Sequence, residues 1–414
     1  MKRIDKHFDI AQEILHLTEK EMKELSSVNI LVLGKSGVGK STLINTIFRE
    51  KIAATGMGKP VTKHLQKISR KDVPITIYDS RGLELSVEVQ KQVQDEVFSL
   101  VERHQSTEDE IHLAYYCIQA TSSRIEETEI KLIEEISKKI PVIVVLTQSI
   151  GEQAREFHRL LENMNIQAAA IHSVLAQEYI ISDEYTVEPF GLTELIQRTF
   201  NLLPGELQRS FTNAQRVDIE QKVKSAKSWA RRSIVASFGV GFVPIPFSDA
   251  SLLVPMQVAL LAHITAIFGV PIDRASLLSI IAAVGGTTSA TVLGRSVVSN
   301  AFKFIPGVGT VIGGFISGTT ASVVTQALAY SYIQVLKLLS EDELMGQESK
   351  TEQIVELMQK EFKKYIQANK NELKSDRNLL DTEKTSALEK IAVGRRTINK
   401  FVDRIKEKFS EDSE

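Results

Sequence analysis

One stretch constrains the fold of this chain more than any other: Val28–Thr42, which reads VNILVLGKSGVGKST. The apolar run Ile30–Leu33 predicts a buried strand, and it is followed by Gly34, four further residues and then Gly39–Ser41. This is the GxxxxGK[ST] spacing of a phosphate-binding loop, in the strand-to-helix context that the motif requires. Glycines let backbone N–H groups turn inward around phosphate oxygens, where a side chain would block the approach. The sequence therefore predicts a nucleotide phosphate site at the end of this strand.

The residues of this loop have distinct expected roles. Lys40 would reach the β- and γ-phosphates, and the Ser41 hydroxyl would bind Mg²⁺. The helix that starts near Lys40 would point its positive end at the anion. The alternative, an ordinary glycine turn before a helix, is disfavoured by the strand, the Lys, the Ser and the amphipathic run LINTIF. The expected nucleotide contacts in the loop are Gly34, Lys35, Ser36, Gly37, Val38, Gly39, Lys40, Ser41 and Thr42.

Residues 28 to about 202 alternate between strand and helix patterns. The predicted strands are Asn29–Leu33, His64–Ser69, Ile75–Tyr78, Ile111–Cys117, Val142–Leu146 and Ala168–Ile171. The predicted helices are Lys40–Arg49, Ser86–Arg103, Glu126–Lys139, Gly151–Met164 and Leu192–Leu203. This alternation predicts an α/β fold, with a mostly parallel sheet covered on both faces. The phosphate loop then lies where such sheets bind ligands.

Two further residues are metal candidates. In ITIYDSRG an apolar strand ends in Asp79, which is placed to hold Mg²⁺ through water, and the N–H of Gly82 can contact the γ-phosphate. The loop KIAATGMGKPVTKHLQK contains Thr62, a candidate switch threonine that binds Mg²⁺ when the γ-phosphate is present. An Asp-capped turn and an ordinary loop threonine are the alternatives. The expected metal ligands are Ser41, Thr62 and Asp79, and the expected reaction-site residues are Lys40, Thr62 and Gly82.

The set GKSGVGKS, Thr62 and DSRG resembles a Ras-like G domain of the bacterial Era/TrmE-related kind. The wording GKSGVGKS is also similar to septin-like and immunity-related GTPases. The resemblance covers about residues 28–202. It implies that the chain binds GTP or GDP with Mg²⁺ and hydrolyses GTP as a molecular switch. It leaves open whether G domains pair into a homodimer or an activating partner is needed.

This sequence departs from the family's pattern at the base site. The guanine-reading [NT]KxD should follow the fifth strand, where PVIVVLTQSIGE offers Thr147 and Gln148 but no Lys or Asp. These two residues are the base-site candidates, and the choice between guanine and adenine stays open. The later loop His172–Ala176 only loosely matches the family's base-backing segment.

Two other departures concern turnover. Leu83 follows Gly82, where Ras-like enzymes carry a water-orienting Gln. Because a leucine cannot orient water, hydrolysis should be slow or need another group or partner. Gly37 occupies the loop position that holds Asn in potassium-dependent relatives, so potassium activation is not implied.

The composition changes after Leu203–Gly205, a predicted boundary. Glu206–Arg232 predicts one polar helix with many basic residues, either a solvated face or a basic flank. From there to Leu336 the chain is apolar, small and glycine-rich, with uncharged windows near the roughly 20 residues that a spanning helix needs. Arg231 and Arg232 fit a cytoplasmic basic flank. The alternative is a compact soluble bundle, since polar residues weaken several windows; these include Gln257, His263, Thr265 and Ser279.

Residues 220–340 are similar to an uncharacterised hydrophobic domain that is often fused behind Era-like G domains in bacteria. The resemblance suggests membrane attachment and brings no established activity. The expected location is the cytoplasmic face of a membrane, or the cytoplasm with peripheral membrane association. The expected layout is an N-terminal amphipathic helix in 1–27, a G domain in 28–203, an all-α hydrophobic domain in 204–340 and charged helices in 341–414.

Composition excludes some classes. The net charge of −2 argues against a general nucleic-acid binder, and no specific nucleic acid is predicted. The single cysteine, Cys117, cannot form an intramolecular disulfide and fits a reducing compartment. The leading hypothesis is a GTPase switch coupled to a membrane-associated helical domain. The alternatives are a nucleotide-binding structural or membrane-remodelling protein with negligible turnover, and an adenine-nucleotide enzyme.

Overall fold

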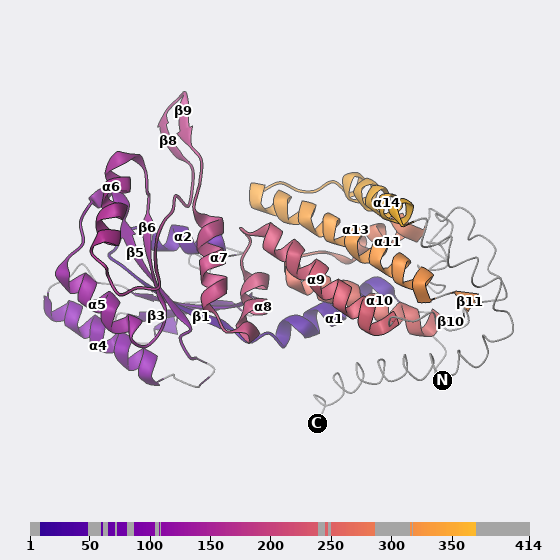
Figure 1. Ribbon diagram of the computed structural model, residues 1–414, viewed down its shortest axis with the longest axis horizontal. Coiled ribbons are helices and arrows are strands. Elements are labelled where there is room, and N and C mark those ends of the chain that lie inside the picture. Colours follow the sequence, from indigo (N-terminus) through magenta and orange to yellow (C-terminus); the bar gives the residue numbers. More distant parts are fainter. Residues whose placement is uncertain are drawn as a thin grey trace. The chain divides into compact units, whose positions relative to one another are not determined.

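The chain folds into two compact units in the computed structural model: Met22–Asp218, and a helical unit that joins Met1–Glu21 to Ile219–Glu414. The structure describes residues 9–48, 59–60, 65–70, 73–80, 87–103, 107, 109–238, 245–246, 250–285, 315–316 and 318–369. Figure 1 shows the elements of both units. The unit with the sheet therefore continues through residues 204–218, beyond the composition change.

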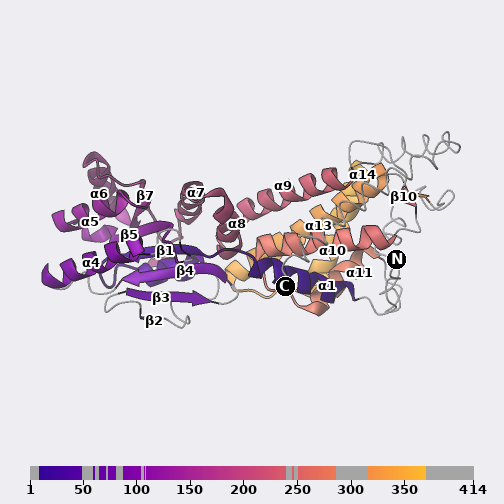
Figure 2. The same cartoon turned by 90° about the horizontal axis from the view of Figure 1, so that it is seen from below.

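Within the described residues, Met22–Asp218 holds a seven-stranded sheet in the order β2-β3-β4-β1-β5-β6-β7. The strands are β2 (Lys59–Pro60), β3 (Leu65–Arg70), β4 (Val73–Ser80), β1 (Val28–Leu33), β5 (Leu113–Gln119), β6 (Val142–Thr147) and β7 (Ala170–Ser173). From β4 to β7 all neighbours are parallel, whereas β3 and β2 are antiparallel additions at one edge (Figure 2). The predicted mostly parallel α/β sheet is confirmed.

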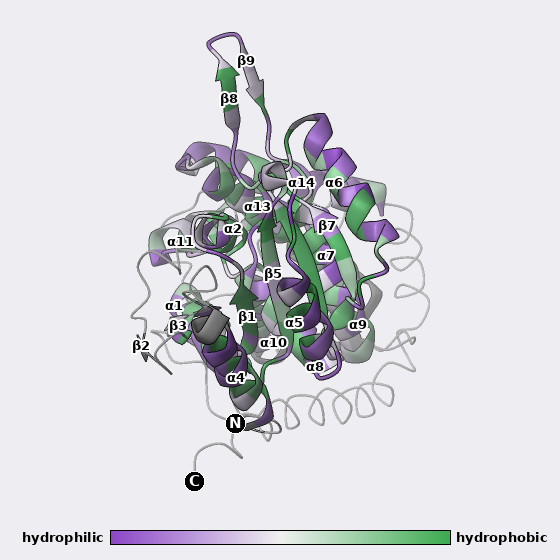
Figure 3. Cartoon of the chain, turned by 90° about the vertical axis from the view of Figure 1, so that its left-hand side faces the viewer, coloured by the Kyte–Doolittle hydropathy of each residue, from purple (hydrophilic) through white to green (hydrophobic). Residues whose placement is uncertain are grey.

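Helices cover both faces of this sheet because its central strands are apolar on both sides. Ile30 and Val32 of β1 pack in one cluster with α2 (Lys40–Ile47), α7 (Leu192–Leu202) and α8 (Gly205–Ala214). Leu31 and Leu33 pack in the opposite cluster with α4 (Val87–Arg103), α5 (Glu127–Ser137) and α6 (Gly151–Asn163). Figure 3 shows hydrophobic β1 and β5 between helices with hydrophilic outer faces. The end of β1 is thus held rigidly from both sides.

A hairpin that the sequence pattern did not predict projects from this unit (Figure 1). Its strands are β8 (Tyr179–Ser182) and β9 (Tyr185–Val187), which form a separate two-stranded sheet. Four residues of β8 in a row are exposed, so no alternation of buried and exposed side chains marks it as a strand.

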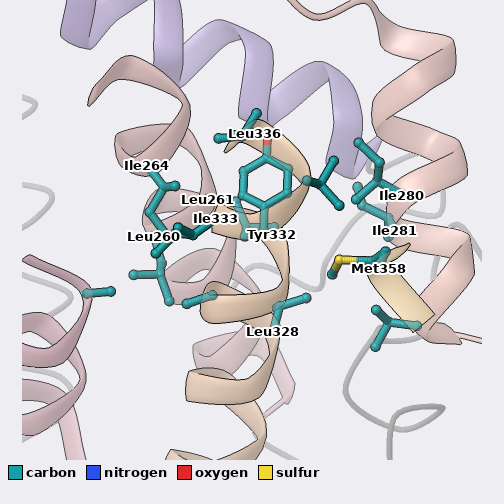
Figure 4. Packing of buried hydrophobic residues seen from close by; sticks show 14 of the residues in the cluster. Leu260, Leu261, Ile264, Ile280, Ile281, Leu328, Tyr332, Ile333, Leu336 and Met358 are labelled. Atoms are coloured by element: carbon teal, nitrogen blue, oxygen red, sulfur yellow. The ribbon is translucent and has the colours of Figure 1, made fainter. Parts of the chain in front are cut away.

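The second unit is a helical bundle, which confirms the predicted helical C-terminal region. Its helices are α1 (Ile10–Lys23), α9 (Ile219–Phe238), α10 (Ala250–Phe268), α11 (Arg274–Gly285), α13 (Gly318–Met345) and α14 (Thr351–Ala368), with a short antiparallel pair, β10 (Ile245–Pro246) and β11 (Phe315–Ile316). Figure 4 shows side chains from α10, α11, α13 and α14 meeting around Tyr332. The Tyr332 hydroxyl is satisfied inside this core by Thr265, 2.7 Å away.

The prediction of one polar helix over Glu206–Arg232 is wrong. The structure has two helices, α8 and α9, separated at Gln215–Asp218. The backbone of Gln215 is extended, and its side chain accepts from Asp218 N at 2.8 Å and donates to Asp218 O at 3.0 Å. These bonds replace the helical ones. Lys222 is fully buried and donates to Phe268 O at 2.8 Å, so this part of the basic run is not a solvated face.

Of the helices that the structure describes, none is both long and apolar enough to cross a membrane. The 19-residue α10 contains Pro255, and its buried Gln257 donates to Thr325 at 3.1 Å. Asp273 accepts from Ser276 N at 2.6 Å and so caps α11. Of the region 341–414 that is predicted to hold charged helices, residues 370–414 lie outside the described residues.

Candidate functional site

The loop between β1 and α2 has the backbone that a phosphate cradle needs. Gly34, Gly37 and Gly39 have φ values of +135°, +79° and +96°, a region that L side chains rarely adopt. A Cβ on Gly34 would lie 2.3 Å from the carbonyl oxygen of Cys117 on β5, so this position excludes every side chain. The loop is therefore pinned against the neighbouring strand where it leaves β1.

Lys40 is folded back over this loop. Its ammonium donates to Gly34 O at 2.8 Å and to Lys35 O at 3.0 Å, and the residue is only 9% exposed. Lys40 is also the first residue of α2, so its charge lies at the positive end of the helix dipole. Ser41 and Thr42 follow it and are exposed. The ammonium is placed so that phosphate oxygens could take over from these two loop carbonyls as its hydrogen-bond acceptors.

Lys35 is a predicted nucleotide contact whose side chain is engaged elsewhere. Its ammonium lies 2.8 Å from Glu126 and 3.2 Å from Glu129, at the start of α5. Burial by itself would lower the pKa of Lys35, but the two carboxylates outweigh it and the pKa is raised. Tyr116 donates to Glu129 at 3.1 Å and holds that carboxylate in place. Lys35 can therefore contact phosphate through its backbone while its side chain anchors the loop to α5.

Asp79 lies at the carboxyl end of β4, and the strand register places it opposite Val32 of β1. It is half-buried beside the strand that leads into the phosphate loop. With the exposed Ser41 hydroxyl it offers the hard oxygen donors that Mg²⁺ prefers, so the residues present fit this ion. The other members of the predicted set, Thr62 and Gly82, lie outside the described residues, as does Leu83.

At the end of β6, Thr147 supports the phosphate loop. Its hydroxyl is the donor to Val38 O in the loop and also lies 3.2 Å from Ile118 O, and the residue is only 3% exposed. A single hydroxyl thus links β5, β6 and the loop. A contact of Thr147 with the base stays a prediction, and in the structure its hydroxyl is bonded to the phosphate loop.

Gln148 has a φ of +49°, and its side-chain oxygen accepts from Gln119 at 3.1 Å. Its amide nitrogen lies 3.9 Å from the Cβ position of Gly39, so the side chain reaches the phosphate loop. Ile150 stands where the family's motif has its Asp. Ser149 is turned inward, since its hydroxyl donates to Leu146 O at 2.9 Å. This edge presents an amide and an alkyl group where guanine readers present a carboxylate.

A cavity of about 650 Å³, which no sequence pattern indicated, borders this edge. It lies between α6 and the base of the hairpin; its lining includes Ile150, Arg155, His158, Arg159, Tyr185 and Phe190. His158 is held by a 2.8 Å hydrogen bond to Ser173. A second histidine, His172 of β7, is hydrogen-bonded to Gly191 O at 2.7 Å, and burial lowers its pKa.

Covalent chemistry is not indicated at Cys117. It is fully buried in β5, and burial raises its pKa to about 12. A thiol in this state is a poor nucleophile. Within the described residues, no group of three or more His, Cys, Asp or Glu side chains could hold a metal ion by itself.

Comparisons with known proteins agree with the loop. Residues 29–148 match the model of the family described as 50S ribosome-binding GTPase. The chain is 25% identical over 168 residues to Septin-9 of Rattus norvegicus, covering 32% of this chain and 28% of the septin. It is 28% identical over 172 residues to Cell division control protein 10 of Saccharomyces cerevisiae, covering 34% and 53%. It is 23% identical over 261 residues to the tRNA modification GTPase MnmE of Pseudothermotoga lettingae, covering 57% and 56%.

The chain therefore spans between 28% and 56% of the length of these relatives. Among solved structures, it is similar to a probable GTP-binding protein engB, with 20% identity, a TM-score of 0.31 and coverage of 42% of this chain and 98% of that one. It is also similar to the G domain of the T. maritima FeoB iron transporter, with 18% identity, a TM-score of 0.29 and the same coverage. The family match and the loop agree that the sheet unit, Met22–Asp218, has the fold of a P-loop GTPase G domain.

Proposed function

We propose that this protein hydrolyses GTP slowly and acts as a nucleotide switch that controls its helical C-terminal region. The observation that carries the proposal is the Lys40 ammonium, held over a left-handed glycine loop at the start of α2. Charge-assisted contacts from Lys40 and backbone N–H groups would hold the phosphates. The family resemblance supports this assignment.

The chain's own residues would divide the work of the reaction. Ser41 and Asp79, with Thr62 in the GTP state, would hold Mg²⁺, which neutralises charge on the phosphates. Lys40 and the N–H of Gly82 would stabilise the γ-phosphate. Leu83 cannot orient water, so we propose slow turnover, or turnover stimulated by a partner.

Binding of a fluorescent GTP analogue with Mg²⁺ tests the site. We expect Lys40→Ala to weaken binding by about 10- to 100-fold, since it removes a charge-assisted hydrogen bond. Ser41→Ala should weaken the Mg²⁺-dependent part. Lys131→Ala is a matched control, because that side chain is 68% exposed on α5. Undiminished binding in both site variants would refute the assignment.

A second candidate is a nucleotide-binding structural protein with negligible turnover. Leu83 and Ile150 favour it, because neither supplies the group that the family uses at its position. Single-turnover hydrolysis, with and without liposomes, separates the two candidates. Hydrolysis that stays at the uncatalysed rate under both conditions would favour the structural role. Displacement of the bound analogue by ATP as readily as by GTP would favour an adenine-nucleotide protein.

Membrane attachment is part of the proposal. It is supported by the apolar stretches after Arg232 and by the resemblance of residues 220–340 to a hydrophobic domain. The same stretches also have a structural role, since α10, α11 and α13 bury apolar side chains in the core of the bundle. Cell fractionation followed by an alkaline carbonate wash tests it. Retention in the pellet supports attachment, and a chain that is soluble from the start contradicts it.

A further inference from the structure

The end of α2 that lies away from the phosphate loop is closed by a residue from far along the chain. A helix leaves its last four carbonyl groups without partners inside the helix. In α2 the first of these, Ile44 O, accepts the N–H of Phe48 at 3.0 Å. The other three carbonyls all accept from Arg216; they belong to Asn45, Thr46 and Ile47.

Arg216 contributes two guanidinium donors and its backbone N–H. Its Nε lies 2.9 Å from Thr46 O, its Nη2 lies 3.2 Å from Asn45 O, and its backbone nitrogen lies 2.9 Å from Ile47 O. The planar fork of an arginine suits two neighbouring carbonyls, which a lysine cannot satisfy in the same way. The cation also complements the negative end of the α2 dipole. Phosphate would therefore bind at the N-terminus of this eight-residue helix, while Arg216 is hydrogen-bonded to its C-terminus.

Arg216 lies in the short connection that leads into α9. On one side, Gln215 pairs with Phe48, the residue that precedes the segment carrying Thr62. On the other side, the mutual bonds of Gln215 and Asp218 fix the turn, and α9 begins at Ile219. Gln197 of α7 donates to the Asp218 carboxylate at 3.1 Å and ties the turn to the sheet unit. Only Val217 and Asp218 separate Arg216, which caps α2, from the first residue of α9 in sequence.

We infer that Arg216 transmits the nucleotide state of the phosphate loop to α9, and so to the helical unit. The inference rests on the proposed function, because it needs a nucleotide that binds the loop. When the loop tightens on a γ-phosphate, α2 moves as one short rigid body. Because three carbonyls of α2 are bonded to Arg216, Arg216 moves with the helix. The mutual hydrogen bonds of Gln215 and Asp218 then transmit this movement to Ile219. Arg216 is a positioning residue that touches no substrate.

The chain contains its own reporter for this movement. Its single tryptophan, Trp229, lies on α9 and stacks on His263 of α10, with ring centroids 3.6 Å apart and planes 11° from parallel. His263 is in turn held by Glu21 of α1 at 2.7 Å. A movement of α9 relative to α10 changes this stack. Trp229 emission therefore reports on the packing inside the helical unit and not on the nucleotide site.

The test uses the full-length chain and two independent signals. A fluorescent GTP analogue measures binding, and Trp229 emission on addition of unlabelled GTP with Mg²⁺ measures the response of the bundle. We expect Arg216→Gln to bind the analogue within about fivefold of wild type, the scale of one hydrogen bond. Its Trp229 response should fall by about fivefold or more, the lower end of typical coupling between sites. Arg198→Gln, an exposed arginine on α7, should behave as wild type.

Each outcome is decisive. A full Trp229 response in Arg216→Gln, or analogue binding by wild type with no Trp229 response, would overturn the coupling while the proposed function stands. Failure of wild type to bind the analogue would overturn the proposed function itself. If Arg216→Gln does not fold, Arg216→Lys decides: it keeps the charge but not the fork. An intermediate response supports the inference, and a full one contradicts it.

Discussion

The ends of β1 and β6 lie in the same sheet, but they match the motifs of the G-domain family to different degrees. After β1, three glycines and Lys40 form a complete phosphate loop. After β6, Gln148 and Ile150 stand where the family's [NT]KxD motif has Lys and Asp, and the Thr147 hydroxyl donates to the loop carbonyl of Val38. The phosphate site combines a backbone shape, which the glycines allow, with one side chain, Lys40. Base selection depends on side chains alone, so it is the part that a few substitutions can alter.

The largest expected effect comes from the glycines. Gly34→Ala should lower the free energy of unfolding by at least about 3 kcal/mol, because the new Cβ meets the Cys117 carbonyl at 2.3 Å and φ is +135°. Gly37→Ala is the matched control: no atom lies within 4 Å of its Cβ, so only the left-handed φ costs, about 1 kcal/mol. Urea denaturation measures both. Equal losses would mean that the contact with β5 does not pin the loop.

Thr147 tests whether the end of β6 serves the phosphate loop. Thr147→Val keeps the shape but leaves the carbonyls of Val38 and Ile118 without this donor, so we expect a loss of about 1–3 kcal/mol in stability. Affinity for GTP and ATP should fall in the same proportion. Thr147→Ser keeps the hydroxyl donor and is the control. A variant that lost affinity for GTP alone would show that Thr147 reads the base after all.

The sequence could predict the phosphate loop and the alternation of strands with helices because both are local patterns. An apolar run followed by spaced glycines needs no distant partner to be recognised. Arg216 and Lys222 belong to a basic run whose pattern predicts an exposed face, yet each caps the end of a helix, α2 and α10 respectively. Their partners lie 170 and 46 residues away in sequence, so periodicity could not show them. The hydrogen bond from Thr147 to Val38 could not be predicted for the same reason, since the two residues are 109 positions apart.

Introducing a carboxylate at residue 150, after β6, tests the contrast between the two strand ends. We expect Ile150→Asp to raise the preference for GTP over ATP by about 10-fold, since the new group can accept from guanine N1–H and N2–H₂. Ile150→Asn is the control, because its amide adds a polar group without the charge. Competition of both nucleotides against the bound analogue measures the ratio. An unchanged ratio in Ile150→Asp would mean that the base does not lie against this edge.

The smallest expected effect comes from Lys35, which joins the phosphate loop to α5. The hydrogen bond from Lys35 lowers the pKa of Glu126 below its ordinary value of 4.5. A lowered carboxyl pKa adds stability above the ordinary value, and this stability is lost as the pH falls through the lowered one. Because both side chains are about one third exposed, we expect Lys35→Met to cost no more than about 0.5 kcal/mol at neutral pH and less near pH 3.

Urea midpoints of wild type and Lys35→Met at the two pH values measure this difference. Lys131→Met is the control, because it breaks the more exposed pair with Glu127 on the same helix. Nucleotide affinity should stay within about threefold in Lys35→Met, since this side chain faces the carboxylates of α5 and the loop binds phosphate through its backbone. A larger loss of affinity would show that Lys35 leaves Glu126 and Glu129 for the phosphate. The loop after β1 would then depend on a side chain, as the edge after β6 does, and the contrast between the two ends would narrow to Lys40 and the glycines.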